Sequence, residues 1–465
     1  MRIPFLLFSL LIFQIMTIKA QNGSINADQL KAIESSFEMN ADNIALMNAI
    51  SNNKISDLAV NRSVAGKTDH LFTYRVKTTG ITNQKQSGRC WMFTGLNVLR
   101  PKVIDHYNLK SFEFSTNYLY FWDLFEKSNL FLQEIILSVN SPLDDKRVEY
   151  LLKNVVGDGG VWNSLANLVE KYGAVPKEIM PETYQSENTS QLNRILVEKL
   201  RQDAMYLRGK YQNKKISTLV MENEKLEMMK DVYRILALSL GVPPKDFEWR
   251  YEDKDGKISD FQKFTPKSFV KEAIPELNLQ DYVLFMNDPS RPYYQLYEID
   301  LDRNVIEGKN WLYINLPADE IKPFAIASIK ANEAMYASCD VGKQLNREEG
   351  VLDPRNYDYA NLFGINLSMD KKQRIQTYQS GSSHGMALVA VDLNKDEKAQ
   401  YWQFENSWGS TNGHEGYLTF TDEWFNEYLF RVVVLKKFVD PKILKILDQK
   451  PILLPPWDPM FLMDE

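Results

Sequence analysis

The sequence contains little cysteine and little histidine. Only two of its 465 residues are cysteines, Cys90 and Cys339, and only four are histidines. One disulfide is the most that could form, and a chain of this length can bury a large core without any. A free thiol is easily oxidised in an oxidising compartment. A cysteine that is present there without a disulfide partner therefore suggests a functional role.

An excess of positive charge is also missing. Lys plus Arg is 55 against 61 for Asp plus Glu, a net charge of −6. The chain therefore lacks the basic footprint of a nucleic-acid-binding protein, and no nucleic acid partner is expected. The remaining composition, 44% hydrophobic and 25% charged, is that of an ordinary globular protein.

One uncharged, mostly apolar run marks the N-terminus. Arg2 precedes it, it covers residues 3–18, and Lys19-Ala20-Gln21 follows. This order predicts a signal peptide over residues 1–20, and hence an exported protein, periplasmic or secreted. The run is short for a membrane helix and contains Pro4, so no stable membrane anchor is expected. A buried first helix is the alternative, but no polar residues alternate with the run.

A cysteine and a tryptophan stand at the head of a second apolar run, residues 91–99. The stretch is Gln84-Lys85-Gln86-Ser87-Gly88-Arg89-Cys90-Trp91. A thiol at a helix N-terminus has a lowered pKa and becomes a nucleophile, and Gln84 is a candidate donor to an oxyanion. The alternative is that Cys90 is a small buried hydrophobe, which is the commoner role of a lone cysteine.

Helical patterns dominate the first half of the chain. We expect a mostly helical segment at 21–79 and a helix from Trp91 that Pro101 interrupts. Beyond these, the patterns predict a buried helix at 117–131, a loop at Gly157-Asp158-Gly159-Gly160, a helix at 161–172, and a long charged helical stretch at 187–240 that Gly241 ends.

After residue 384 the pattern becomes that of strands. Residues 386–391 and 400–406 are predicted as strands on either side of a turn at 394–398, so we expect Gly385 to pair with Asn406. That pairing leaves His384 beside Asn406, whose side chain can fix the imidazole tautomer. The other three histidines have no such companion, and His384 is therefore the candidate base.

The chain resembles the papain-like cysteine peptidases, specifically the branch of bleomycin hydrolase and aminopeptidase C. The resemblance is carried by blocks that span nearly the whole chain: Thr82 to Trp91, Asp158-Gly159-Gly160, Cys339 to Lys343, Glu405 to Gly409, Gly416-Tyr417-Leu418, Thr421 to Phe425 and Trp457 to Met460. It implies an α+β, two-lobe papain-like fold. A helical lobe would carry the cysteine, an antiparallel β-barrel lobe would carry the histidine and asparagine, and a helical insertion and a C-terminal arm in the cleft would be added.

The resemblance also implies roles for individual residues. Cys90 would be the nucleophile, His384 the general base and acid, and Asn406 the group that orients His384. Gln84 and the Cys90 backbone amide would form the oxyanion hole.

Further residues would support this set. Trp408 would shield the hydrogen bond between Asn406 and His384, and Trp91 would be a supporting residue. Gly159 and Gly160 would pair with the substrate backbone, since only glycine allows so close an approach. No metal and no cofactor is expected.

The expected domain boundaries follow from the same reasoning. After the signal peptide at 1–20, they are an N-terminal helical extension at 21–79, the helical lobe at 80–186, a largely helical insertion with connecting strands at 187–350, the β lobe at 351–450 and a C-terminal arm at 451–465. The insertion explains why Cys90 and His384 are about twice as far apart as the roughly 130–150 residues of papain relatives. In the resembled branch, such insertions support a homo-hexamer. Ser87 stands where papain-type enzymes have a cysteine that forms a disulfide, so this disulfide is absent here.

The tail from Pro451 to Glu465 suggests the specificity. Four prolines exclude a helix interior or a central strand, and side chains including Leu453, Trp457 and Phe461 are too apolar to be left in water. By the resemblance, the arm blocks one end of the cleft and its terminal carboxylate, on Glu465, holds the substrate ammonium.

We therefore expect a cysteine aminopeptidase that removes N-terminal residues from peptides through a thioester. A papain-like endopeptidase or amidase is the first alternative, and a non-catalytic binding protein is a more remote one. Cys339 could pair with Cys90 but is expected to be a buried structural thiol.

Overall fold

The computed structural model describes residues 23–214 and 217–461. The predicted signal peptide and Glu465 lie outside these residues. By the contacts within the chain, two compact units are distinguished, Met1–Val60 and Asn61–Glu465. Within the described part, no helix is long and apolar enough to cross a lipid bilayer.

The described part of the first unit is helical, as predicted. It contains α1 (Ala27–Ser35), α2 (Ala41–Asn52) and the single turn α3 (Ile55–Leu58). Asn26 caps α1 through a capping box, because its side chain accepts from the Gln29 backbone while the Gln29 side chain reaches back. None of these helices has a buried side chain. The prediction of helix up to Thr79 is wrong for residues 59–79, which contain no helix and one short strand, β1 (Tyr74–Arg75).

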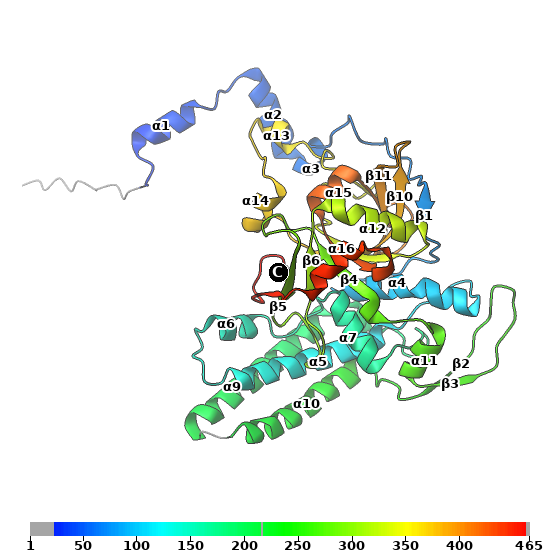
Figure 1. The fold of residues 1–465 in the computed structure, drawn as a ribbon. Coiled ribbons are helices and arrows are strands. Elements are labelled where there is room, and N and C mark those ends of the chain that lie inside the picture. The colour runs from blue at the N-terminus through cyan, green and yellow to red at the C-terminus, as the bar shows by residue number, and fades with distance from the viewer. Residues whose placement is uncertain (1–22, 215–216, 462–465) are drawn as a thin grey trace, which may run out of the picture. The chain divides into compact units, whose positions relative to one another are not determined.

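Helices from three parts of the sequence form the helical lobe of the second unit. Figure 1 shows α5 (Thr116–Leu137), α9 (Ser190–Lys214) and α10 (Thr218–Leu240) running alongside one another. The predicted buried helix at 117–131 corresponds to α5, which is buried or half-buried from Thr116 to Ile136 because α4 (Cys90–Tyr107), α7 (Trp162–Tyr172), α9 and α10 contact it. The chain of the predicted insertion therefore shares its hydrophobic core with the rest of the lobe.

The helix of the candidate nucleophile, α4 (Cys90–Tyr107), is longer than predicted. We expected Pro101 to interrupt it, but the helix continues through the proline for another six residues. Pro101 lacks the N–H that would bond one turn back, and that loss costs helix stability. Here α4 is buried from Trp91 to Pro101, and packing against the sheet and α7 outweighs the loss.

The predicted helix at 161–172 forms as α7 (Trp162–Tyr172), and Gly173 ends it. Gly173 has φ +75°, and a Cβ there would lie 2.3 Å from the Pro266 backbone. Only glycine fits, for reasons of both conformation and space.

A large mixed sheet forms the second lobe. In the described residues it has twelve strands in the order β14-β5-β6-β4-β13-β7-β10-β11-β12-β9-β8, with β1 beside β10. The central pairs are antiparallel, as predicted, whereas β12–β9, β4–β6 and β14–β5 are parallel. The strands not yet given are β4 (Tyr282–Met286), β5 (Gln295–Ile299), β6 (Leu312–Asn315), β7 (Met335–Cys339), β8 (Leu345–Asn346), β9 (Val351–Leu352), β10 (His384–Leu393), β11 (Ala399–Glu405), β12 (Tyr417–Thr421), β13 (Leu429–Leu435) and β14 (Ile452–Leu454).

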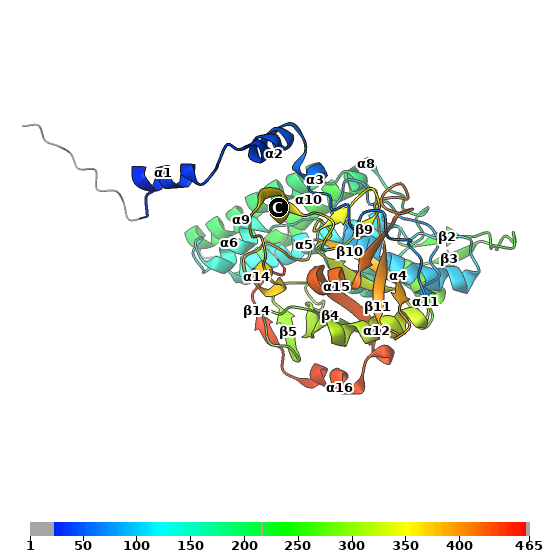
Figure 2. The ribbon, with the colours of Figure 1, turned by 90° about the horizontal axis from the view of Figure 1, so that it is seen from above.

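Helices cover this sheet. α4 and α12 (Ala318–Lys330) contact β10, and α15 (Asp422–Tyr428) contacts β11 and β12 (Figure 2). The remaining described elements are α6 (Lys146–Lys153), α8 (Tyr184–Glu187), β2 (Phe247–Trp249), β3 (Gln262–Phe264), α11 (Pro266–Ala273), α13 (Tyr359–Phe363), α14 (Lys371–Gln376), α16 (Pro441–Leu444) and three short 3₁₀ turns, Leu279–Asp281, Lys436–Phe438 and Lys445–Asp448.

The predicted β10–β11 hairpin is present, but its predicted register is wrong by one residue at the ends and by two in the middle. The turn closes with a hydrogen bond from Asn394 N to Lys398 O, as expected. At the other end Ala387 pairs with Glu405, a register in which Gly385 does not face Asn406. The register shifts twice along the hairpin, and a uniform count from the turn misses each irregularity.

The C-terminal arm is extended at its start, as its prolines predicted. β14 lies at the edge of the sheet and pairs in parallel with β5. Leu453 is 63% exposed, so the expectation that it would be kept from water is wrong. Met460, farther along, is 2% exposed and belongs to the hydrophobic core.

Candidate active site

The candidate nucleophile and base lie together where the two lobes meet. Cys90 is the first residue of α4 and His384 the first of β10, and their side chains are hydrogen bonded. Burial raises the pKa of the Cys90 thiol, but the His384 imidazole and the backbone of Gly385 and Trp91 outweigh burial and leave that pKa lowered. Burial likewise opposes the charged form of His384, yet Cys90 and Asn406 leave the pKa of His384 raised. Both shifts favour a thiolate and an imidazolium.

Asn406 fixes the imidazole from the other side. His384 Nε2 lies 2.9 Å from Asn406 Oδ1, which also accepts from the Ser407 backbone N–H at 2.8 Å. A backbone N–H can only donate, so the amide oxygen must face it, and the proton of the imidazole must then be on Nε2. Nδ1 is left for the Cys90 sulfur.

Trp408 lies against the imidazole, as the resemblance implied. Its ring centroid is 4.9 Å from that of His384, and the ring is half-buried. Arg347 in turn lies 5.0 Å from the Trp408 ring centroid, a cation–π distance. The positive charge of Arg347 lowers the pKa of His384 against the larger effects above. Arg347 had no role in the sequence prediction.

Gln84 is held by both lobes. Its backbone N–H donates to Ser407 O at 2.8 Å, and its side-chain Oε1 accepts from Ser407 Oγ at 2.7 Å. Its Nε2 donates to Ser87 O at 2.7 Å, which uses one of the two N–H groups of that nitrogen. These hydrogen bonds fix the orientation of the buried amide relative to the loop that leads to Cys90.

The glycine loop is tied to the nucleophile by Asp158. The Asp158 carboxylate accepts from the Gly88 backbone at 2.8 Å and from Tyr120 at 2.7 Å, and it also bonds Thr189 and Asn193. These hydrogen bonds outweigh burial and leave the pKa of Asp158 lowered. Its backbone oxygen accepts from Trp91 Nε1 at 2.6 Å. Asp158 thus fixes the position of the glycines that follow it relative to Cys90.

Lys127 holds the same loop through its carbonyl groups. Its Nζ donates to the carbonyls of Gly157 (2.9 Å) and Gly159 (2.6 Å) and forms a 2.6 Å ion pair with Asp123 one turn earlier on α5. It also lies 5.4 Å from the Trp91 ring centroid. Gly160 packs directly on Trp91, since a Cβ there would be 2.5 Å from Trp91 Cε2.

A cleft of about 790 Å³ opens at Cys90 and His384. The residues that line it come from both lobes and from the C-terminal arm, and they include Cys90, Trp91, Gly159, Gly160, His384, Tyr336, Asp302, Arg431, Met460 and Phe461. The last two belong to the arm. Five predicted site residues, Cys90, Trp91, Gly159, Gly160 and His384, therefore line one cavity together with the end of the described chain, whereas Gln84, Asn406 and Trp408 lie outside its lining.

Two arginines fasten the arm. Arg291 forms an ion pair with Asp458, and Asp458 Oδ1 accepts from the Met460 backbone at 3.1 Å. Arg431 Nη2 donates to Met460 O at 2.5 Å, and its guanidinium lies 4.3 Å from the Phe461 ring centroid. The arm is thus anchored by charge as well as by apolar packing as it enters the cleft.

Comparison with known proteins agrees with this geometry. A model of the Peptidase C1-like family matches residues 24–461. The chain belongs to this family. It is 38% identical over 455 residues to bleomycin hydrolase of Mus musculus, covering 96% of this chain and all of the relative. It is 37% identical over 439 residues to aminopeptidase C of Streptococcus thermophilus, covering 94% and 98%.

A solved structure extends the comparison to the fold. The crystal structure of PepW from Lactobacillus rhamnosis matches with a TM-score of 0.91 at 37% identity, over 96% of this chain and all of the other. The predicted papain-like α+β fold is confirmed, and so is the predicted family. The chain is a cysteine peptidase by family, and these relatives support an aminopeptidase.

The other cysteine and two of the histidines do not line the cleft. Cys339 is fully buried on β7, where it pairs across the sheet with His384, and both cysteines are free thiols. Burial raises the pKa of Cys339 well above that of an ordinary thiol. His70 and His414 stack on each other with centroids 4.0 Å apart, a contact that no local pattern indicated, and neither lines the cleft.

Several positioning residues escaped the sequence reasoning. Lys127 and Asp123 share a face of α5 at a spacing of four residues, which was the available signal for their ion pair. Ser407, Arg347 and Arg431 gave no local signal, because their partners are distant in the sequence. Glu465 lies outside the described residues, and its predicted role stays a prediction.

Proposed function

We propose that this chain is a cysteine aminopeptidase in which Cys90, His384, Asn406 and Gln84 carry the chemistry. The observation that carries the proposal is that Met460 and Phe461, at the end of the described chain, line the same cleft as Cys90 and His384. An arm fastened there by two arginines leaves less room for residues that precede the scissile bond. Relatives named aminopeptidase C and bleomycin hydrolase match almost the whole chain.

The geometry supports the following mechanism. The Cys90 thiolate attacks the carbonyl carbon of the first peptide bond, and the carbonyl oxygen becomes an oxyanion that the second N–H of Gln84 and the Cys90 backbone N–H stabilise. His384 gives its proton to the leaving amine as the tetrahedral intermediate collapses to a thioester. His384 then takes a proton from water, the hydroxide attacks the thioester, and the acid leaves while the thiolate is regenerated.

Each surrounding group has a part in this scheme. Asn406 holds the His384 imidazole in the orientation that faces Cys90. Trp408 shields the hydrogen bond between Asn406 and His384 from water. Gly159 and Gly160 offer backbone groups to the substrate. The acidic end of the arm, including Glu465, would attract the substrate ammonium, because opposite charges attract strongly in a cleft of low dielectric.

The nucleophile is tested by Cys90→Ala. We expect hydrolysis of aminoacyl amides to fall by roughly a thousandfold or more. His384→Ala should show a similar loss, while Cys339→Ala should retain turnover because that thiol is outside the cleft. Retained peptidase activity in Cys90→Ala would end the proposal.

The arm is tested by deleting Pro456–Glu465. We expect the shortened enzyme to gain cleavage of N-acetylated peptides, which the full chain should leave intact, and to lose preference for a free N-terminus. Asp458→Asn keeps the arm at full length but weakens its ion pair with Arg291, and we expect cleavage of N-acetylated peptides at a rate between those of the full chain and the shortened enzyme. If acetylated peptides stay intact after deletion, the arm is not the gate; if the full chain cleaves them, it is an endopeptidase.

Assembly and export complete the proposal. We propose a homo-hexamer, the assembly that the family resemblance implies; contacts between subunits would cover exposed apolar side chains on α1 and α2, among them Leu30, Ile33 and Ile44. Light scattering of the purified protein tests it, and a monomer would refute it.

We also propose that residues 1–20 direct export. Fractionation of expressing cells, with N-terminal sequencing of the mature chain, tests that step.

A further inference from the structure

Arg89, the residue before the nucleophile, is fully buried although it carries a charge. Its Nη2 forms a 2.9 Å ion pair with Glu182, and its guanidinium lies over the rings of Phe93 and Tyr120 at 5.3 and 5.1 Å. Burying a charge costs free energy unless the charge is paired. A buried ion pair directly before the nucleophile therefore suggests a role beyond stability.

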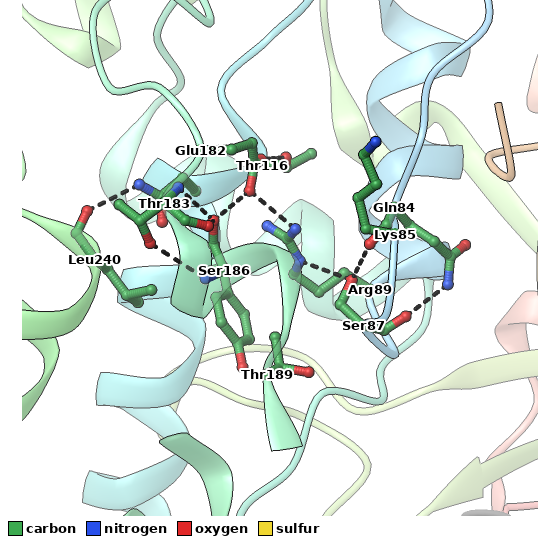
Figure 3. Close-up of polar contacts among 12 residues, drawn as sticks. Gln84, Lys85, Ser87, Arg89, Thr116, Glu182, Thr183, Ser186, Thr189 and Leu240 are labelled. Carbon is green, nitrogen blue, oxygen red and sulfur yellow. Dashed lines mark hydrogen bonds and ion pairs between the residues drawn. The ribbon is translucent and has the colours of Figure 1, made fainter. Parts of the chain in front are cut away.

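Glu182 is itself held in place by its neighbours. Its carboxylate accepts from Thr116 Oγ1 at the start of α5 and from Ser186 Oγ at 2.5 Å (Figure 3). Burial would raise the pKa of Glu182, but Arg89 and these hydroxyls leave it lowered, which keeps the carboxylate charged. The pair is therefore a fixed point on the helical lobe.

The other side of Arg89 leads to the candidate oxyanion donor. Arg89 Nε donates to Ser87 Oγ at 3.1 Å, and Ser87 Oγ donates to Gln84 O at 2.7 Å. Gln84 Nε2 donates back to Ser87 O at 2.7 Å. Figure 3 shows this continuous path from Glu182 through Arg89 and Ser87 to Gln84.

The loop on this path is exposed between two buried ends. Lys85, Gln86 and Gly88 are exposed, and Lys85 has φ +54°, an uncommon conformation for a lysine. Gln84 and Arg89, at the two ends, are buried. The two expected oxyanion donors, Gln84 Nε2 and the Cys90 backbone N–H, also stand at the two ends of this loop. A fixed separation between them is what electrostatic stabilisation of an oxyanion requires.

We propose that the Arg89–Glu182 ion pair is a positioning unit that sets Gln84 in the oxyanion hole by way of Ser87. The inference rests on the proposed function, since it assumes the oxyanion chemistry at Cys90. Neither charge touches substrate. Their effect is on the distance between the two donors and hence on the transition state, with little effect on substrate binding or on the reactivity of the thiolate.

Two mild variants test the path. Ser87→Ala removes its middle link and leaves the ion pair intact. Arg89→Lys keeps the charge beside Glu182 but cannot present a guanidinium Nε to Ser87. We expect kcat for a fluorogenic aminoacyl amide to fall roughly tenfold in each, with KM within about twofold. Glu182→Gln, which keeps an acceptor for the hydroxyls, should lower kcat as well, and thermal melting checks that each variant is folded.

Two inhibitors separate the oxyanion hole from the thiolate. A peptide aldehyde forms a hemithioacetal whose oxygen uses the hole, so its Ki should rise by the same factor by which kcat falls. Iodoacetamide alkylates Cys90 without an oxyanion, so its rate constant should stay within about twofold. The control Lys177→Gln removes an exposed 2.7 Å ion pair with Glu113 on the same lobe and should leave all of these values unchanged.

The outcomes are distinct. An unchanged kcat in Ser87→Ala and Arg89→Lys would overturn the inference. So would a loss of alkylation as large as the loss of kcat, because the change would then act on the nucleophile or the fold. Failure of the proposed function shows elsewhere, as turnover that survives Cys90→Ala.

Discussion

Arg100 and Glu405 form a buried ion pair that joins the two halves of the active site. Arg100 Nη2 lies 2.6 Å from Glu405 Oε1, and the side chains are 1% and 0% exposed. Arg100 is on α4, the helix that starts at Cys90, and Glu405 is the last residue of β11, directly before Asn406. Arg100 also donates to Gly80 O at 2.9 Å. One lobe supplies the cation and the other the anion.

This pair gives a prediction about stability. Arg100→Met should destabilise the protein by about 3–5 kcal/mol, since it leaves the Glu405 carboxylate buried without its cation. The double variant Arg100→Met/Glu405→Met should recover much of that loss, because neither charge of the pair is left over. Thermal or urea unfolding measures both. Lys153→Gln, which breaks an exposed ion pair with Glu149, is the control and should change stability by less than about 0.5 kcal/mol. Equal stability of the single and double variants would contradict this interpretation.

The pH dependence of kcat/KM should report the Cys90–His384 pair. Activity needs the thiolate and the imidazolium together, so it should fall in acid as pH drops through the lowered pKa of Cys90 and in alkali as pH rises through the raised pKa of His384. Asn406 helps to raise the pKa of His384, so Asn406→Ala should move the alkaline limb to lower pH. The maximum should also fall roughly tenfold to a hundredfold.

A second substitution at the same position reverses the sign. Asn406→Asp places a negative charge beside His384, which favours the imidazolium, so the alkaline limb should move to higher pH. Limbs that do not respond to either variant would show that Asn406 does not orient the imidazole.

The two thiols should differ in reactivity. Cys90 is half-buried in the cleft with a lowered pKa, whereas Cys339 is fully buried with a raised pKa. A disulfide reagent should therefore titrate one fast thiol in the native protein and two after denaturation. Cys90→Ala should abolish the fast phase and leave the second thiol detectable only in denaturant. A fast phase that persists in Cys90→Ala would assign the reactive thiol to Cys339.

Gly160→Ala should impair substrate binding at the glycine loop. Its Cβ would meet Trp91 Cε2 at 2.5 Å, so Trp91 or the loop must shift. We expect kcat/KM to fall roughly tenfold or more, because the backbone that is proposed to bind the substrate is displaced. Gly209→Ala is a matched control on α9, where a Cβ meets nothing within 4 Å, and it should stabilise the helix by about 0.5–1 kcal/mol with activity retained. Equal activity of the two variants would show that the close contact with Trp91 does not matter for turnover.

Local patterns were enough to predict that Cys90, His384 and Asn406 lie together. Cys90 precedes an apolar run and begins a helix, and His384 and Asn406 lie at the open end of one hairpin, so their proximity needed only a turn and an alternation of side chains. The same count gave a register wrong by one or two residues. β-bulges are set by the neighbouring strands and the bend of the sheet, and neither is visible in the sequence of a single hairpin.

The support of those groups could not be predicted in this way. Arg89–Glu182, Arg100–Glu405 and Arg431–Met460 join residues that are far apart in the sequence, and charged residues are usually solvated, so composition predicts no partner for them. Pro101 shows the same limit, because its helix persists only through burial against other elements.

The sequence by itself determined the reaction, through a thiol at a helix start, a hairpin that pairs an imidazole with an amide, and motifs that mark the family. Only the tertiary structure decided how the reacting groups are held and which part of the arm lines the cleft. The physical reason is range: helix starts, turns and alternation depend on neighbours in the chain, whereas buried ion pairs and the path of the arm depend on surfaces that exist only after the lobes have packed together.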